Sequence, residues 1–131
     1  MKLKGPILLN RLELQIMKII WKKEQATARQ VKKELDKKRP LAYSTVATML
    51  KYLEQKGFLT HDVGNRAYVY KPLVQEEEVS KGMLQDLIDR LFDGEAELLM
   101  NTLAKVKDLK KEEVQQLRDR ITQHYKEKAD G

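Results

Sequence analysis

The chain has 131 residues, of which 41% are hydrophobic and 35% are charged, enough for one compact domain or a small domain with an extension. It contains no cysteine, which excludes disulfides and thiolate metal sites and is typical of a reducing cytoplasm. No stretch approaches the roughly 20 apolar residues of a membrane span, and no signal-peptide core precedes the first periodic helix, so we expect a cytoplasmic protein without membrane association.

The formal charge of +6 is unevenly distributed along the chain. Residues 1–73 carry 16 Lys and Arg against 6 Asp and Glu, a net +10, whereas residues 74–131 carry 10 against 14, a net −4. This asymmetry predicts a basic domain, 1–73, that meets a polyanion, and a second domain, 74–131, with another task. A membrane surface is the competing polyanion, but its binding needs an exposed aromatic helix face, and the single Trp lies in an ordinary core pattern.

Two helices open the basic half. Asn10 and Glu13 have capping-box spacing, and the first helix then shows apolar residues at helical intervals, at Leu14, Met17, Ile20 and Trp21. Thr27 and Gln30 repeat the same box at the start of a second, lysine-rich helix, which Pro40 is expected to stop.

The third helix is predicted from about Ser44 to Gly57, a residue suited to the left-handed cap position. Its buried face consists of Val46, Met49, Leu50 and Leu53. Two strand patterns, "FLTHDV" and "RAYVYKPL", follow, joined at Gly64-Asn65, which accepts the positive φ of a tight hairpin. We therefore predict a mainly α fold with a small β-hairpin: a winged helix-turn-helix domain.

The acidic half is predicted to contain three more helices, at about 76–92, 95–107 and 111–126. Three such helices cannot easily bury all their apolar stripes alone, so we expect a twofold homodimer through residues 74–126. The alternative is that they fold back on the first domain. The residues expected at the dimer interface are Leu84, Leu87, Leu91, Leu99, Leu103, Leu117, Ile121 and Tyr125.

The third helix has the composition of a helix that enters the major groove. Such a helix needs small hydrogen-bonding side chains at its N-terminal turn, where base edges are closest, and Ser44, Thr45 and Thr48 supply them. The start of the second helix and the hairpin tip would then contact phosphates. The predicted partner is double-stranded DNA, and the predicted contact residues are Thr27, Arg29, Tyr43, Ser44, Thr45, Thr48, Lys51, Tyr52 and Arg66.

Each of these features also has a purely structural interpretation. Ser44 or Thr45, taken singly, is more often a plain N-cap, and a Lys-rich helix is more often a solvated face. The DNA interpretation gains weight because net charge, topology and a polar helix face all fall in the same half of the chain. The alternative function is a winged-helix docking module that binds an acidic protein.

Enzymatic chemistry is not indicated. The two histidines, His61 and His124, lie in different halves, and no Gly-rich phosphate loop or G-x-S-x-G elbow is present. Asp62 beside His61 is expected to be a surface pair on the hairpin. The sequence predicts no catalytic residues, no metal site and no cofactor.

The stretch "YSTVATMLKYLEQKGFLTHDVGNRAYVYKPL" resembles the penicillinase-repressor family, the bacterial winged-helix repressors of β-lactamase and methicillin-resistance genes, which include a copper-responsive branch. "LNRLELQIMKIIWKK" resembles the first helix of that family, and "ELLMNTLAKVKDLKKEEVQQLRDRI" its C-terminal dimerisation region. The resemblance implies a homodimer that binds an inverted-repeat operator and blocks transcription.

Several positions depart from the family pattern. Ala47 and Tyr52 stand where many members carry a basic residue, which implies a different base preference. The β-lactam-responsive members are released by cleavage of an Asn-Phe bond, and the matching pair here is Asn101-Thr102, the candidate site for a regulatory protease. The copper branch uses a C-terminal cysteine motif, and the lack of cysteine excludes that route.

Overall fold

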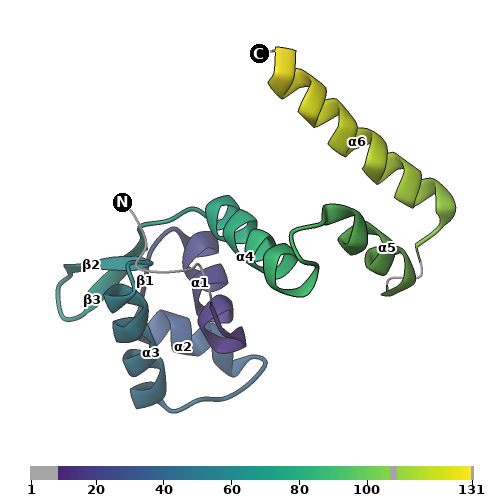
Figure 1. Cartoon of the computed structure of the whole chain (residues 1–131). Coiled ribbons are helices and arrows are strands. Elements are labelled where there is room, and N and C mark those ends of the chain that lie inside the picture. Colours follow the sequence, from purple (N-terminus) through teal and green to yellow (C-terminus); the bar gives the residue numbers. More distant parts are fainter. Residues whose placement is uncertain (1–8, 107–108, 131) are drawn as a thin grey trace. The chain divides into compact units, whose positions relative to one another are not determined.

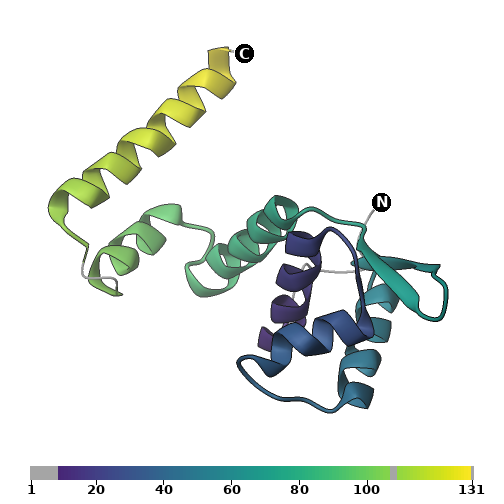
Figure 2. The ribbon, with the colours of Figure 1, turned by 180° about the vertical axis from the view of Figure 1, so that it is seen from behind.

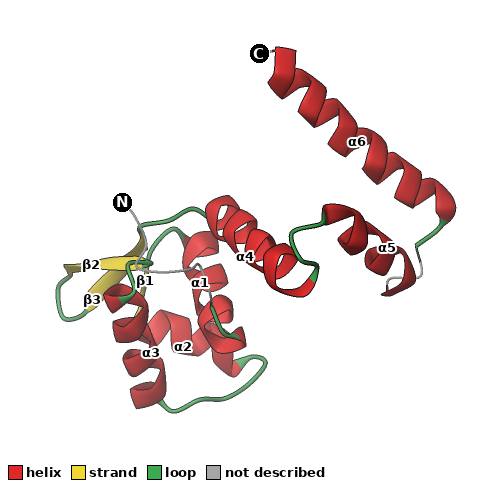
Figure 3. Ribbon diagram, in the orientation of Figure 1, coloured by secondary structure: helices red, strands yellow, loops and turns green. Residues whose placement is uncertain are grey.

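The computed structural model describes residues 9–106 and 109–130, with side chains through Glu127. Helices dominate, and three short strands form one sheet (Figure 3). In chain order (Figure 1) the elements are α1 (Arg11–Lys23), β1 (Ala26–Thr27), α2 (Ala28–Asp36), α3 (Tyr43–Gln55), β2 (Leu59–Val63), β3 (Tyr68–Pro72), α4 (Glu76–Leu91), α5 (Ala96–Val106) and α6 (Lys111–Asp130). The mainly α class is confirmed, and the expected two-stranded hairpin is part of a three-stranded sheet.

The chain divides into two compact units, residues 1–86 and 87–131. The division falls within α4 and not after Leu73, where the charge distribution changes sign. Val74 and Val79 are each 2% exposed in the core of the first unit, and Met83 packs against the same core. The first half of α4 therefore completes the basic unit, and its buried Val79 is not available to a second subunit.

Both predicted capping boxes are formed. Asn10 Oδ1 accepts the Glu13 N–H at 2.8 Å and Glu13 Oε1 accepts the Asn10 N–H at 3.0 Å; the Thr27–Gln30 pair repeats this at the start of α2, at 3.2 and 2.9 Å. Each box satisfies two backbone donors that a helix start otherwise leaves unpaired. The helix boundaries at this end of the fold are thus local properties of the sequence.

The α2 helix ends four residues earlier than expected. It stops at Asp36 with Lys37 as C-cap, because the Lys38 and Arg39 N–H groups turn back to the Leu35 carbonyl, at 3.0 and 2.8 Å, well before Pro40. α1, α2 and α3 pack around a common core. Figure 2 shows the ribbons of these helices from behind. Ile16, Met17, Ile20, Val31, Val46, Leu50 and Leu53 have no measurable exposure there, and burying each contributes about 1.5–3 kcal/mol.

The C-terminus of α3 reverses the chain into the sheet. Gly57 has φ +92°, its N–H donates to the Glu54 carbonyl at 3.0 Å, and the Phe58 N–H donates to the Leu53 carbonyl at 3.0 Å. These two bonds form a Schellman cap, in which a residue without Cβ is favoured. The left-handed role expected of Gly57 is confirmed.

The sheet is antiparallel with strand order β1-β3-β2. β1 pairs with β3 through Ala26 opposite Tyr70, and β2 pairs with β3 from Leu59 opposite Pro72 to Val63 opposite Tyr68. We call the β2–β3 hairpin, residues 59–72, the wing.

The expected turn chemistry of the wing is wrong. Neither Gly64 nor Asn65 has a positive φ. The Gly64 N–H instead donates to the Ala67 carbonyl at 2.8 Å, and a Cβ on Gly64 would lie 3.0 Å from that oxygen and 3.2 Å from Val69 Cγ2. Glycine is needed at this position for the close approach of two backbone segments.

The second unit contains the end of α4 together with α5 and α6. Phe92 and Met100 are buried there, and Arg118 of α6 pairs with Glu97 of α5 at 2.9 Å. The two helices begin within a residue of the predicted positions, and α6 continues to Asp130. The predicted end of α5, Lys107, lies outside the described residues.

Candidate nucleic-acid interface

One face of α3 is exposed to solvent. We call it the recognition face, and its six exposed residues are Tyr43, Ser44, Thr45, Thr48, Lys51 and Tyr52. The opposite face of the helix is sealed by Val46, Leu50 and Leu53 in the core. Helical periodicity therefore separates the hydroxyl-bearing side chains from the apolar ones, as the sequence predicted.

The N-cap interpretation of Ser44 and Thr45 is wrong. The helix begins at Tyr43, its N-cap is Ala42, and no side chain caps it. The Thr45 N–H donates to the Ala42 carbonyl at 3.1 Å, so this turn is closed by backbone alone. Neither hydroxyl is needed as the cap of this helix, and both side chains lie on the exposed face.

The predicted phosphate-contacting residues occupy two other parts of the same unit. Arg29 is exposed in the first turn of α2, whereas the Thr27 hydroxyl already accepts the Gln30 N–H and is half-buried. Arg66 is exposed in the loop that joins β2 to β3. Lys71 of β3 is paired with Asp62 of β2 at 2.5 Å, and this ammonium lowers the pKa of the Asp62 carboxyl. Among the described residues, no carboxylate forms an ion pair with Arg29 or Arg66.

Sequence reasoning missed a polar cluster at the base of the wing. His61 Nδ1 lies 2.5 Å from Glu54 Oε1 at the end of α3, and the His61 ring stacks on Tyr68 with centroids 4.0 Å apart. Asp62, expected to pair with its neighbour His61, pairs with Lys71 instead. The alternation of side chains along a strand predicts that His61 and Asp62 do not pair, because it places residues 61 and 62 on opposite faces.

Tyr70 lies beneath this cluster. It is 8% exposed, and its ring centroid is 5.8 Å from that of His61. Burial raises the pKa of the Tyr70 hydroxyl above its usual value of 10.0, and the nearby Glu54 carboxylate raises it further. The wing is thus anchored to α3 by a titratable and largely aromatic contact.

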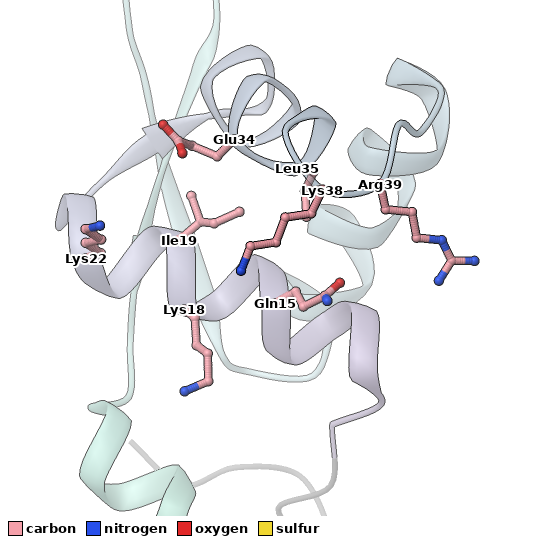
Figure 4. A pocket seen from close by; sticks show the side chains of 8 residues that line it. All are labelled: Gln15, Lys18, Ile19, Lys22, Glu34, Leu35, Lys38 and Arg39. Carbon is pink, nitrogen blue, oxygen red and sulfur yellow. The ribbon is translucent and has the colours of Figure 1, made fainter.

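A cavity of about 310 Å³ lies between α1 and α2. None of the residues predicted to contact DNA lines it, and its apolar lining residues are Ile19 and Leu35. In Figure 4, Lys38 extends from the end of α2 toward α1, while Arg39 points away from the cavity. Glu34 in its wall is paired with Lys37 at 3.1 Å, which lowers the pKa of that carboxyl. The Lys and Arg side chains that line the cavity carry positive charge on a surface other than the recognition face.

The residues predicted at the dimer interface are largely uncovered. Leu84 is 47% exposed in the first unit, and several apolar side chains of the second unit are at least as open, including Leu91 at 65% and Tyr125 at 68%. Leu87 and Ile121 are exposed too, and Leu99, Leu103 and Leu117 are half-buried. Exposed large apolar side chains in this number are typical of an association site.

Among the described residues, no group of three or more histidine or carboxylate side chains could hold a metal ion. None of the described helices is long and apolar enough to span a bilayer.

Comparison with known proteins agrees with this arrangement. The family model of the penicillinase repressor matches residues 9–123. The penicillinase repressor of Bacillus licheniformis is 29% identical over 118 residues, covering 90% of this chain and 92% of that protein. The transcriptional regulator BlaI of Mycobacterium tuberculosis is 34% identical over 87 residues, covering 66% of this chain and 63% of that protein.

A solved structure shares the fold of the first unit. The solution structure of the DNA binding domain of the repressor BlaI superposes with a TM-score of 0.51 at 36% identity, covering 57% of this chain and 92% of that one. The winged-helix class is thereby confirmed, and these relatives are repressors and not enzymes. With a family model that covers most of its length, the chain belongs to the penicillinase repressor family.

Proposed function

We propose that the protein is a sequence-specific DNA-binding transcriptional repressor that acts as a homodimer on an inverted-repeat operator. In each subunit the recognition face of α3 enters the major groove and the wing contacts the backbone. The observation that carries this proposal is the exposed α3 face, whose hydroxyls at Ser44, Thr45 and Thr48 are free of any capping role.

The chemistry of this face suits base recognition. Ser and Thr hydroxyls both donate and accept, so they can pair with base edges, while Lys51 supplies a cation farther along the helix. The only carboxylate of α3 is Glu54, which is bound to His61. The face therefore presents no unpaired acid to the phosphates. The relative whose domain matches the first unit is described as a DNA-binding repressor, which also supports the proposal.

Dimerisation would follow from the apolar surface of α4, α5 and α6. Burying Leu87, Leu91, Ile121 and Tyr125 against a second copy would remove them from water. A twofold dimer binds half-sites about one helical turn apart, or a multiple of it, so operator symmetry mirrors protein symmetry.

The regulatory cleavage expected at Asn101-Thr102 remains a proposal. Both residues are exposed, but they lie inside α5, Ala96–Val106. Proteases act preferentially on locally opened chain, so cleavage here would require α5 to unwind first. Release of the repressor by this route would then be governed by the local stability of the second unit.

The test is selection of bound fragments from genomic DNA by the full-length protein, followed by gel shift. The proposal predicts enrichment of an inverted repeat that is bound more tightly than a scrambled version at the same salt concentration. Failure to shift any DNA at low salt would favour the docking module that binds an acidic protein.

A further inference from the structure

The end of α3 and the wing are joined by a short contact between two side chains. Glu54 Oε1 lies 2.5 Å from His61 Nδ1. The His61 ring is stacked on Tyr68, with an interplanar angle of 17°, and Tyr68 meets Tyr70 edge-on at 6.4 Å. A carboxylate in the last turn of α3 is thereby connected to both strands of the wing.

Glu54 is unfavourably placed for any role other than this contact. A negative charge near a helix C-terminus opposes the macrodipole. A carboxylate beside the recognition face would also repel phosphates. By these two effects alone, substitution of Glu54 should stabilise α3 and strengthen DNA binding. If substitution instead weakens DNA binding, the contact with His61 is the role of Glu54.

We propose that Glu54 and His61 form a clamp that holds the wing on the C-terminal end of α3. The clamp fixes the distance from Arg66 at the wing tip to the recognition face, so that both meet one duplex in a single register. Glu54 and His61 are positioning residues and need not touch DNA. The consequence for DNA rests on the proposed function, whereas the clamp itself is a property of the free protein.

Residues of α3 and of the wing surround His61. His61 faces Glu54 of α3 and the rings of Tyr68 and Tyr70, and Asp62 beside it is held by Lys71. A protonated imidazole forms a charge-assisted bond with the carboxylate, which is stronger than the bond made by a neutral imidazole. In both protonation states the Nδ1–H can donate to Glu54 Oε1, so the geometry alone carries the clamp.

Hydrogen exchange on the full-length protein without DNA tests the clamp directly. Glu54→Ala should speed amide exchange in β2 and β3 and leave α1 unchanged. Glu34→Ala, which removes a carboxylate from an exposed ion pair elsewhere in the unit, is the matched control and should leave the wing unaffected. Wing protection in Glu54→Ala equal to that of the wild type would overturn the proposal.

Affinity ratios test the consequence for DNA. Glu54→Ala and His61→Ala should each lower the cognate-to-random ratio about three- to tenfold, and the double variant should lower it no further. His61→Gln, whose amide can still donate to Glu54, should restore part of the ratio, while His124→Gln in α6 should keep the wild-type ratio.

Tighter binding of Glu54→Ala to cognate and random DNA alike would contradict the clamp and indicate simple charge repulsion. If the wild type shows no preference for any fragment, the proposed function fails, and the exchange measurement still decides the clamp.

Discussion

The Glu13 carboxylate of α1 accepts a hydrogen bond from Lys56 Nζ at the C-terminus of α3, at 2.6 Å. Glu13 is 3% exposed, and its other oxygen accepts the Asn10 N–H at 3.0 Å. One buried side chain thus caps the first helix and ties it to the end of the helix that carries the recognition face.

Glu13→Ala should lower the free energy of unfolding by about 1–3 kcal/mol, because it removes both bonds and leaves polar partners without an acceptor. Chemical denaturation followed by circular dichroism measures this. Lys18→Met, which breaks an exposed pair with Glu76, is the control and should change stability by less than about 1 kcal/mol. If the two substitutions lower the free energy of unfolding equally, the buried bonds of Glu13 contribute no more to stability than an exposed ion pair.

Capping at α2 and α3 should differ under the same substitution. Thr27→Ala removes the side-chain cap of α2 and should cost about 1 kcal/mol. Ser44→Ala should stay within about 0.5 kcal/mol of the wild type, because α3 has no side-chain cap. Thermal melting of both variants measures the contrast, and a clear loss in Ser44→Ala would restore the capping interpretation of that residue.

The contrast shows where sequence reasoning succeeds. The boxes at Asn10 and Thr27, and the glycine cap at Gly57, are local motifs, and all three form as expected. The sequence predicts the start of α3 one residue late, because Ala42 is an unusual N-cap that no propensity rule selects. The apolar face of α3 was identified because its spacing is strictly helical.

Features that depend on tertiary contact were not predictable in this way. β1 has two residues and exists only because Ala26 and Thr27 pair with β3. The contact of Glu54 with His61 crosses a reversal at Gly57, and no local pattern announces it. Val74 and Val79 lie in the acidic half of the sequence, yet both are buried in the core of the basic unit.

Tyr70 should make stability fall at alkaline pH. Its folded-state pKa is raised above 10.0, so its contribution is fully present below pH 10 and is lost as pH rises through the folded-state value. Tyr70→Phe should remove this part of the pH dependence, measured by denaturation between pH 9 and 11. Tyr52→Phe, at an exposed site, is the control and should preserve the wild-type slope.

Self-association should depend on the apolar surface of the second unit. Ile121→Asp places a charge where we propose a dimer interface and should shift sedimentation at micromolar protein concentration from dimer to monomer. Thr122→Asp is the matched control, since Thr122 is exposed on α6 and is not among the proposed interface residues. A wild-type protein that sediments as a monomer would contradict the proposed dimer.

The most direct test of the account is the affinity of Thr45→Ala for a selected fragment and for its scrambled counterpart, at one salt concentration. We expect the preference for the selected fragment to fall by about 1–3 kcal/mol, whereas Arg66→Ala should weaken both complexes nearly alike. If Thr45→Ala keeps the full wild-type preference, the outward side of α3 does not read base edges, and the account is wrong.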